Sequence, residues 1–140
     1  MNSITKATGV CLCGKVEIHA ATMSLDVGAC HCSMCRTWSG GPMMTVDCHT
    51  SVEITGTEYV SVYESSEWAE RGFCNHCGTH LFYRLKQNDQ YIVPAGLFGD
   101  RIKLNFDHQV FIDDKPEYYT FANKTKNMTG EEVFAQFAAD

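Results

Sequence analysis

Seven of the eight cysteines in this 140-residue chain fall into three tight clusters, and clustered thiolates are typical zinc ligands. In chain order the clusters are a C-x-C pair, a triplet and a C-x-x-C pair: Cys11 and Cys13; Cys30, Cys32 and Cys35; Cys74 and Cys77. Zinc–sulfur bonds are about 2.3 Å long, and cysteines two or three residues apart can reach one ion with little loss of chain entropy. The spacing therefore predicts up to two zinc ions, one in a closed four-thiolate site and one in an open three-thiolate site.

The closed site is expected to combine the two pairs, referred to below as the quartet. A C-x-x-C pair followed by glycine is a specific zinc motif, because Gly78 can take a positive φ and let the chain turn back under the metal. C-x-C is a less common half-site. Cys11 and Cys13 are assigned to zinc mainly because Cys74 and Cys77 are available to complete four ligands.

A disulfide framework is the alternative, since eight cysteines are an even number and small secreted domains are often cross-linked in this way. Residues 1–9 are mostly polar and do not resemble the apolar centre of a signal peptide, so we expect a reducing compartment, the cytoplasm. Disulfides also stabilise most when they close long loops, whereas these cysteines are near neighbours in sequence. Metal binding is the better interpretation.

The triplet decides what the chain can do, because three sulfurs leave a tetrahedral ion one ligand short. Cys48, His49 or another histidine could close the site and make it structural. Alternatively, water or substrate takes the fourth ligand position. Three thiolates make zinc a weak Lewis acid, so the ion is better suited to binding a thiol than to polarising a carbonyl. Zinc would then lower the pKa of that thiol and hold its sulfur near an electrophile. Cys48 itself is either a small buried residue or, in a third interpretation, a redox nucleophile.

Composition indicates a single domain over residues 1–140, since 44% apolar and 20% charged residues are ordinary for a globular protein. No apolar run approaches the roughly 18 residues that a membrane helix needs, so no membrane partner is expected. The formal charge is −6, and eleven Lys and Arg are scattered among seventeen acids. Proteins that bind nucleic acid usually carry a basic face, so a nucleic-acid partner is also not expected. The oligomeric state is left open.

Short apolar or alternating runs separated by turn residues predict a mainly β, antiparallel fold. The expected strands are residues 15–20, 25–29, 43–48, 51–54, 58–63, 80–85, 91–95 and 109–112. A short C-terminal helix is expected from Thr129, capped by that side chain and by Glu132, and a shorter helix or turn is expected over residues 33–39. Five aromatic residues are expected in the core: Trp68, Phe73, Phe82, Tyr83 and Phe98.

Three segments resemble the glutathione-dependent formaldehyde-activating enzyme family, which includes the centromere protein V group. They are Gly-Val-Cys-Leu-Cys-Gly-Lys-Val at 9–16, Cys-His-Cys-Ser-Met-Cys-Arg-Thr-Trp-Ser-Gly-Gly at 30–41, and Ser-Ser-Glu-Trp-Ala-Glu-Arg-Gly-Phe-Cys-Asn-His-Cys-Gly-Thr-His-Leu at 65–81. The resemblance covers about residues 9–119. It implies several coiled antiparallel sheets, as in Rab accessory proteins, with structural zinc at the quartet and catalytic zinc at the triplet.

The activity implied by the resemblance is a carbon–sulfur lyase reaction, the joining of glutathione and formaldehyde into S-hydroxymethylglutathione. A small thiol such as glutathione is therefore the expected partner. Arg36, Trp38 and Arg71 are candidate contacts for its carboxylates and apolar stem. Tyr118 or Tyr119 stands where many relatives have tryptophan. A non-catalytic zinc module remains the alternative function, and a thiol-redox enzyme using Cys48 is a weaker one.

Overall fold

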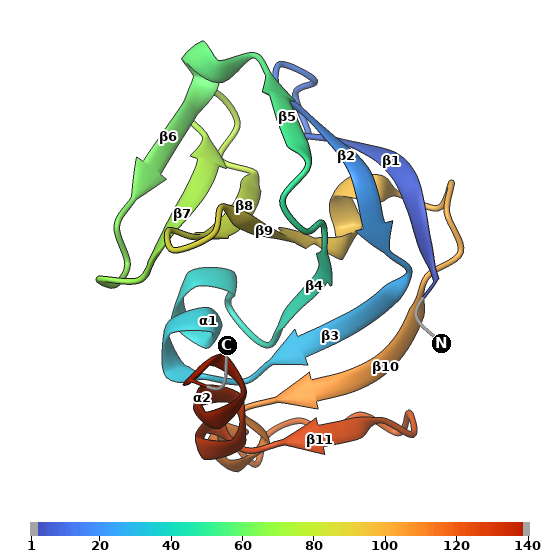
Figure 1. Cartoon of the computed structure of the whole chain (residues 1–140), viewed down its shortest axis with the longest axis vertical. Coiled ribbons are helices and arrows are strands. Elements are labelled where there is room, and N and C mark those ends of the chain that lie inside the picture. Colours follow the sequence, from blue (N-terminus) through green and yellow to red (C-terminus); the bar gives the residue numbers. More distant parts are fainter. Residues whose placement is uncertain (1–2, 139–140) are drawn as a thin grey trace. The chain divides into compact units, whose positions relative to one another are not determined.

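The structure, a computed structural model, describes the backbone of residues 3–138 and the side chains of residues 3–136 (Figure 1). The chain divides into two compact units. The first unit is Met1–Leu25 with Thr45–Lys103, and the second is Asp26–Met44 with Leu104–Asp140. The two predicted metal sites lie in different units: the quartet belongs to the first unit and the triplet to the second.

The first unit is built from antiparallel strands. A three-stranded sheet has the order β1-β2-β5, and a second set of neighbouring strands has the order β4-β9-β8-β7-β6. The strand bounds are β1 (Ile4–Val10), β2 (Glu17–Ser24), β4 (Met43–Asp47), β5 (Val52–Thr55), β6 (Val60–Tyr63), β7 (Ala69–Cys74), β8 (His80–Leu85) and β9 (Gln90–Pro94). Residues 45–47 of β4 belong to this unit, and its first two residues belong to the second. Two 3₁₀ turns, η1 (Thr57–Tyr59) and η2 (Ala95–Phe98), follow β5 and β9.

Alternation along these strands supplies the core of the first unit. In β2, Ile18 and Ala20 are each 1% exposed, while their neighbours are partly exposed. Gly72 in β7 lies against an aromatic ring, since a Cβ atom there would be 2.3 Å from Cζ of Phe82. A larger residue at position 72 would therefore displace a buried ring.

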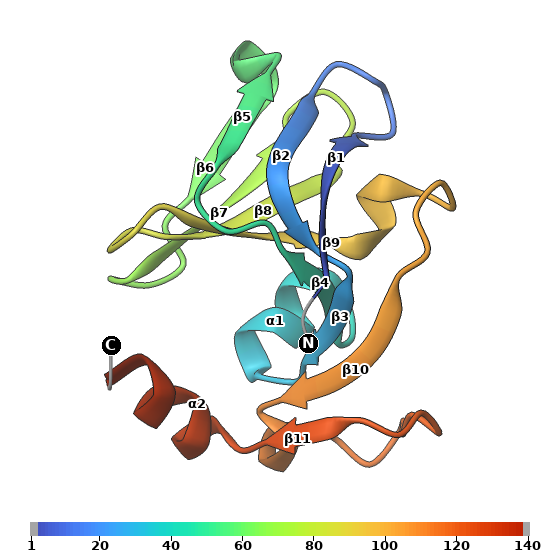
Figure 2. The same ribbon diagram turned by 45° about the vertical axis from the view of Figure 1, so that its right-hand side comes forward.

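The second unit contains the remaining elements. They are β3 (Asp26–Cys30), α1 (Ser33–Ser39), β10 (Asn105–Val110), the 3₁₀ turn η3 (Ile112–Asp114), β11 (Lys126–Met128) and α2 (Gly130–Ala138). Strand β10 pairs in parallel with β3 on one side and with β11 on the other (Figure 2). The antiparallel pairing expected from the sequence therefore holds in the first unit, and β10 is the exception.

Both helices begin as the sequence predicts. The Sγ atom of Cys32 caps α1 by accepting a 3.3 Å hydrogen bond from the backbone N–H of Cys35. Before α2, the N–H of Glu132 donates to Oγ1 of Thr129 and the N–H of Thr129 donates to Oε1 of Glu132, which is the reciprocal pair of a capping box. No helix among the described residues is both long and apolar enough to cross a membrane.

The mainly β class and the short C-terminal helix are confirmed, but some expectations are wrong in detail. Strands β1, β7 and β11 were not expected. The strand expected over 109–112 lies instead at Asn105–Val110, and Phe111 has a φ of 54° that ends it. Phe82 and Phe98 are buried as predicted, whereas Trp68 is 48% exposed.

Candidate metal centre

The quartet is assembled from two hairpin turns of the first unit. Cys11 and Cys13 lie between β1 and β2, and Cys74 and Cys77 lie at the junction of β7 and β8. All four Sγ atoms are within 4.8 Å of one another. The Cys11–Cys13 and Cys13–Cys74 sulfur pairs are 3.5 and 3.7 Å apart. A tetrahedral zinc ion with bonds of about 2.3 Å has ligand–ligand edges of about 3.8 Å, so the donor set fits zinc.

The C-x-x-C turn is held by a close network of hydrogen bonds. The N–H of Cys74 donates to the carbonyl of Thr79 at 2.8 Å, and the N–H of Gly78 donates to the carbonyl of Cys74 at 2.7 Å. Gly78 has the positive φ that the motif predicted, at 81°. Oγ1 of Thr79 is 3.1 Å from Sγ of Cys77 and accepts a bond from the N–H of Leu12. Thr79 thus ties the two halves of the quartet together, a role not anticipated from sequence.

Hydrogen bonds favour the ionised sulfur that a metal needs at Cys11 and Cys77, whereas desolvation, together with hydrogen bonds to the neighbouring sulfurs, raises the pKa of Cys13 to about 12. The side-chain and backbone hydrogen bonds from Thr79 lower the pKa of Cys77 to about 5. Sγ of Cys11 accepts a 3.3 Å bond from the N–H of Val16. Both interactions offset part of the cost of placing several thiolates together in the absence of a cation.

The triplet is formed by one short segment of the second unit. Cys30 ends β3, Cys32 caps α1 and Cys35 lies in the first turn of α1, and their Sγ atoms are within 4.8 Å of one another. Among the described residues of this unit, no further Cys, His, Asp or Glu side chain joins the group. Hydrogen bonds with the Cys32 and Cys35 sulfurs raise the pKa of Cys30, and burial and repulsion from the Cys35 thiolate raise it further. A bound cation would relieve that repulsion.

His31 lies between two of these cysteines, and its side chain is 0% exposed. Its Nε2 atom is 2.7 Å from Oε1 of Gln109, and its Nδ1 atom is 2.7 Å from the hydroxyl of Tyr119. Burial lowers the pKa of His31, which favours the neutral ring. The Gln109 amide donates its own N–H to Oγ1 of Thr125, so its oxygen faces the histidine. His31 therefore donates from Nε2 and accepts the Tyr119 hydroxyl proton at Nδ1.

The other predicted contacts occupy different environments. The Nε atom of Arg36 donates a 2.8 Å bond to the carbonyl of His31, and Trp38 is half-buried on the same helix α1. Arg71 belongs to the first unit, where it is 2% exposed, donates to Oγ of Ser65 and stacks on Tyr83 at 4.9 Å. So little exposed surface favours a structural role for Arg71. Binding of substrate by these three residues stays a prediction.

Comparison with known protein families matches residues 6–114 to the model of the glutathione-dependent formaldehyde-activating enzyme. The chain belongs to that family. The matched region contains both cysteine clusters, and it ends before Tyr119 and the loop that leads to β11. Family membership thus covers the candidate metal ligands but not every residue around the triplet.

Two similar proteins extend the comparison. A protein of Schizosaccharomyces pombe named an uncharacterized lyase is 40% identical over 126 residues, covering 89% of this chain and 92% of the relative. A crystal structure of a Rhodobacter sphaeroides protein shares the fold, with a TM-score of 0.57 and 24% identity over 66% of this chain and 88% of that one. Membership of the family and the relative's lyase name agree with the chemistry that the triplet offers.

Proposed function

We propose that this chain is a zinc-dependent carbon–sulfur lyase that joins a small thiol, glutathione as the first candidate, to formaldehyde. The observation that carries the proposal is the triplet. Three sulfurs from one segment lie within 4.8 Å of one another, and the described part of their unit supplies no fourth protein ligand. The family's formaldehyde-activating name and the lyase name of the yeast relative support this chemistry.

The reaction requires three changes: the thiol loses its S–H proton, a carbon–sulfur bond forms to the aldehyde carbon, and the carbonyl oxygen gains a proton. Zinc held by the triplet would lower the pKa of the incoming thiol and fix its sulfur near the aldehyde. The same steps in reverse release formaldehyde. No oxidant or reductant is needed, so free thiol and aldehyde balance the product.

The chain's own residues hold the ligand segment rigid. The N–H of Cys35 donates to Sγ of Cys32, and Nε of Arg36 donates to the carbonyl of His31. The His31 ring is fixed on its other side by Gln109 and Tyr119. These bonds place the three sulfurs before any ligand arrives, which reduces the entropy lost on binding. The terminal N–H groups of Arg36 are the proposed contact for a glutathione carboxylate.

Two other functions receive less support. In a non-catalytic zinc module, the triplet would either be closed by a fourth protein ligand or bind no zinc. A thiol-redox enzyme would use Cys48, but this residue is 0% exposed. Burial, and to a smaller extent the negative charge of Asp47, raises the pKa of its thiol to about 12. Such a thiol is protonated and inaccessible. We also propose a reducing compartment, the cytoplasm, because all eight cysteines are free.

Cobalt substitution tests the proposal. Co²⁺ bound by the triplet should show thiolate charge-transfer bands that change on addition of glutathione but not of S-methylglutathione, whose sulfur cannot ionise. With formaldehyde present, NMR should show S-hydroxymethylglutathione forming faster than in the uncatalysed reaction. Cys32→Ser should abolish the excess rate, and Cys48→Ala should leave it unchanged.

The outcomes separate the candidate functions. A cobalt spectrum that responds to glutathione without any rate gain would mean that the site binds thiols and that formaldehyde is the wrong electrophile. A spectrum that ignores glutathione but changes in Cys48→Ala would identify Cys48 as the fourth ligand. That result would replace the lyase with the zinc module.

A further inference from the structure

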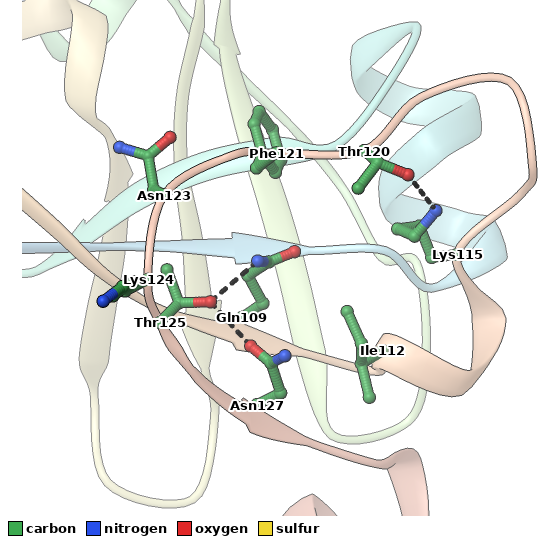
Figure 3. A pocket seen from close by; sticks show the side chains of 9 residues that line it. All are labelled: Gln109, Ile112, Lys115, Thr120, Phe121, Asn123, Lys124, Thr125 and Asn127. Atoms are coloured by element: carbon green, nitrogen blue, oxygen red, sulfur yellow. Dashed lines mark hydrogen bonds between the residues drawn. The ribbon is translucent and has the colours of Figure 1, made fainter.

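The second unit contains a cavity of about 510 Å³ beside β10, and the proposed lyase chemistry places neither zinc nor substrate in it (Figure 3). Its walls come from β10, η3 and the segment that leads to β11. The lining residues are Gln109, Ile112, Lys115, Thr120, Phe121, Asn123, Lys124, Thr125 and Asn127. Its volume lies within the range of about 300–1,000 Å³ that is typical of small-molecule sites.

The charge of the lining is opposite to that of the whole chain. The lining includes two lysines and no acidic residue, although the chain carries a formal charge of −6. Lys124 is exposed, and among the described residues it has no carboxylate partner. The Nζ atom of Lys115 donates to the carbonyls of Pro116 and Tyr119 and to Oγ1 of Thr120, all of them neutral acceptors. Neither positive charge is therefore neutralised by the lining, and an anion would be attracted to the cavity.

The polar groups around these lysines suit an organic ligand. Gln109, Asn123 and Asn127 bring three primary amides, each with donors and an acceptor, and Figure 3 shows Gln109 joined to Asn127 through Thr125. Phe121 and Ile112 add apolar wall. A ligand with a carboxylate and a short carbon chain would match both kinds of surface better than a bare inorganic ion would.

We propose that this cavity is a binding site for a small organic carboxylate, held by the Lys124 ammonium in the field of Lys115 and by the side-chain amides. The proposal goes beyond the lyase function, because it requires neither a metal nor a thiol. Lys115 acts mainly through its charge, since its three N–H groups already have acceptors. Lys124 supplies the direct charge-assisted hydrogen bond.

The cavity is distinct from the triplet but linked to it. Gln109 pairs with Ala29 in the parallel β3–β10 ladder, and the next pair is Val110 with Cys30. Successive side chains of a strand point to opposite faces, so the Gln109 side chain and the Cys30 sulfur lie on opposite faces of this pair of strands. The two sites are connected by the 2.7 Å hydrogen bond that Nε2 of His31 donates to Oε1 of Gln109.

The test is an NMR titration of the zinc-loaded full chain with glutarate, and with glutaramide as a neutral control of the same carbon skeleton. Glutarate should shift the side-chain amide signals of Gln109, Asn123 and Asn127, and glutaramide should not. Lys124→Gln should raise the glutarate Kd about tenfold or more, as expected for loss of a hydrogen bond to a charged group. Lys126→Gln is the matched control, because Lys126 is equally exposed two residues away but does not line the cavity. It should change Kd by less than about twofold.

Three results would overturn the proposal: no shift with glutarate, shifts that lie elsewhere, or equal weakening by the two lysine substitutions. Each of them leaves the lyase proposal untouched, because glutarate has no thiol. Conversely, glutarate binding that depends on Lys124 would support the carboxylate site even if glutathione failed to change the cobalt spectrum. Thermal melts of Lys124→Gln exclude loss of folding as the cause, since an exposed lysine should leave Tm unchanged.

Discussion

Replacing Cys74 by serine removes a sulfur at the most buried position of the quartet. Cys74 is 0% exposed, and it ends β7, where its N–H and carbonyl both make backbone hydrogen bonds within the turn. Its sulfur is 3.7 Å from that of Cys13, in a cage whose four sulfurs come from two separate hairpins. The substitution therefore weakens the bond that a metal would form between distant parts of the first unit.

The expected cost follows from two contributions. Structural zinc sites contribute about 10–16 kcal/mol of apparent binding free energy, so one of four equal ligands is worth about 2.5–4 kcal/mol. A serine hydroxyl buried at this position without a partner adds about 1–3 kcal/mol. The sum, about 3.5–7 kcal/mol, is comparable to the lower part of the range of unfolding free energies of typical domains, about 5–15 kcal/mol. Cys74→Ser should therefore be largely unfolded or insoluble.

Two matched variants make the measurement decisive. Cys13→Ser removes a ligand from the same quartet at an exposed position, so it tests metal loss without a buried hydroxyl. Cys32→Ser removes a ligand from the triplet and should fold with an almost unchanged Tm. Elemental analysis should find between one and two zinc ions per wild-type chain and at most one in Cys32→Ser, and thermal melts give the Tm of each variant. The reasoning fails if Cys74→Ser and Cys32→Ser have the same Tm and the same zinc content.

Three further predictions concern residues outside the quartet and the triplet. Gly56→Ala should lower the free energy of unfolding by several kcal/mol, because residue 56 has a φ of 79° and a Cβ there would be 1.9 Å from the carbonyl oxygen of Lys15. Urea unfolding measures this loss, and an unchanged midpoint would contradict the backbone geometry. Thr129→Ala should cost about 1 kcal/mol through loss of the capping box with Glu132, and Thr129→Ser should restore it. Because the folded pKa of Cys48 is raised from 9.0 to about 12, stability should fall as pH rises from 9 toward 12, and Cys48→Ala should flatten that slope.

Local patterns explain what could be predicted from sequence. The cysteine spacings, the positive φ of Gly78, the bounds of α1 and the capping box of α2 all depend on residues within a few positions of one another. In such short segments the residue types alone restrict the backbone and the ligand geometry. The same reasoning located most of the strands of the first unit.

Strand β7 shows why other elements were missed. Its sequence places Glu70, Arg71 and Gly72 in the middle of the strand, which hides the alternation that predicts strands. Arg71 is buried there because Tyr83 stacks on it and Ser65 accepts its Nε–H, and both partners come from other segments. Gly72 is required by the Phe82 ring on the neighbouring strand. These compensations are tertiary contacts, so no local pattern shows them.

Tertiary contacts that no local pattern shows also surround the triplet, and they have a functional consequence. The three sulfurs are local, but the histidine between them is fixed by Gln109 and Tyr119, which lie 78 and 88 positions away. The backbone carbonyl of Tyr119 accepts a hydrogen bond from Nζ of Lys115, a residue that lines the cavity. The ligand set therefore determines that a metal can bind, whereas the residues from 109 to 127 determine how rigidly the ligand segment is held. Relatives with the same cysteines and a different segment there should retain zinc binding and differ in the molecules that they bind beside it.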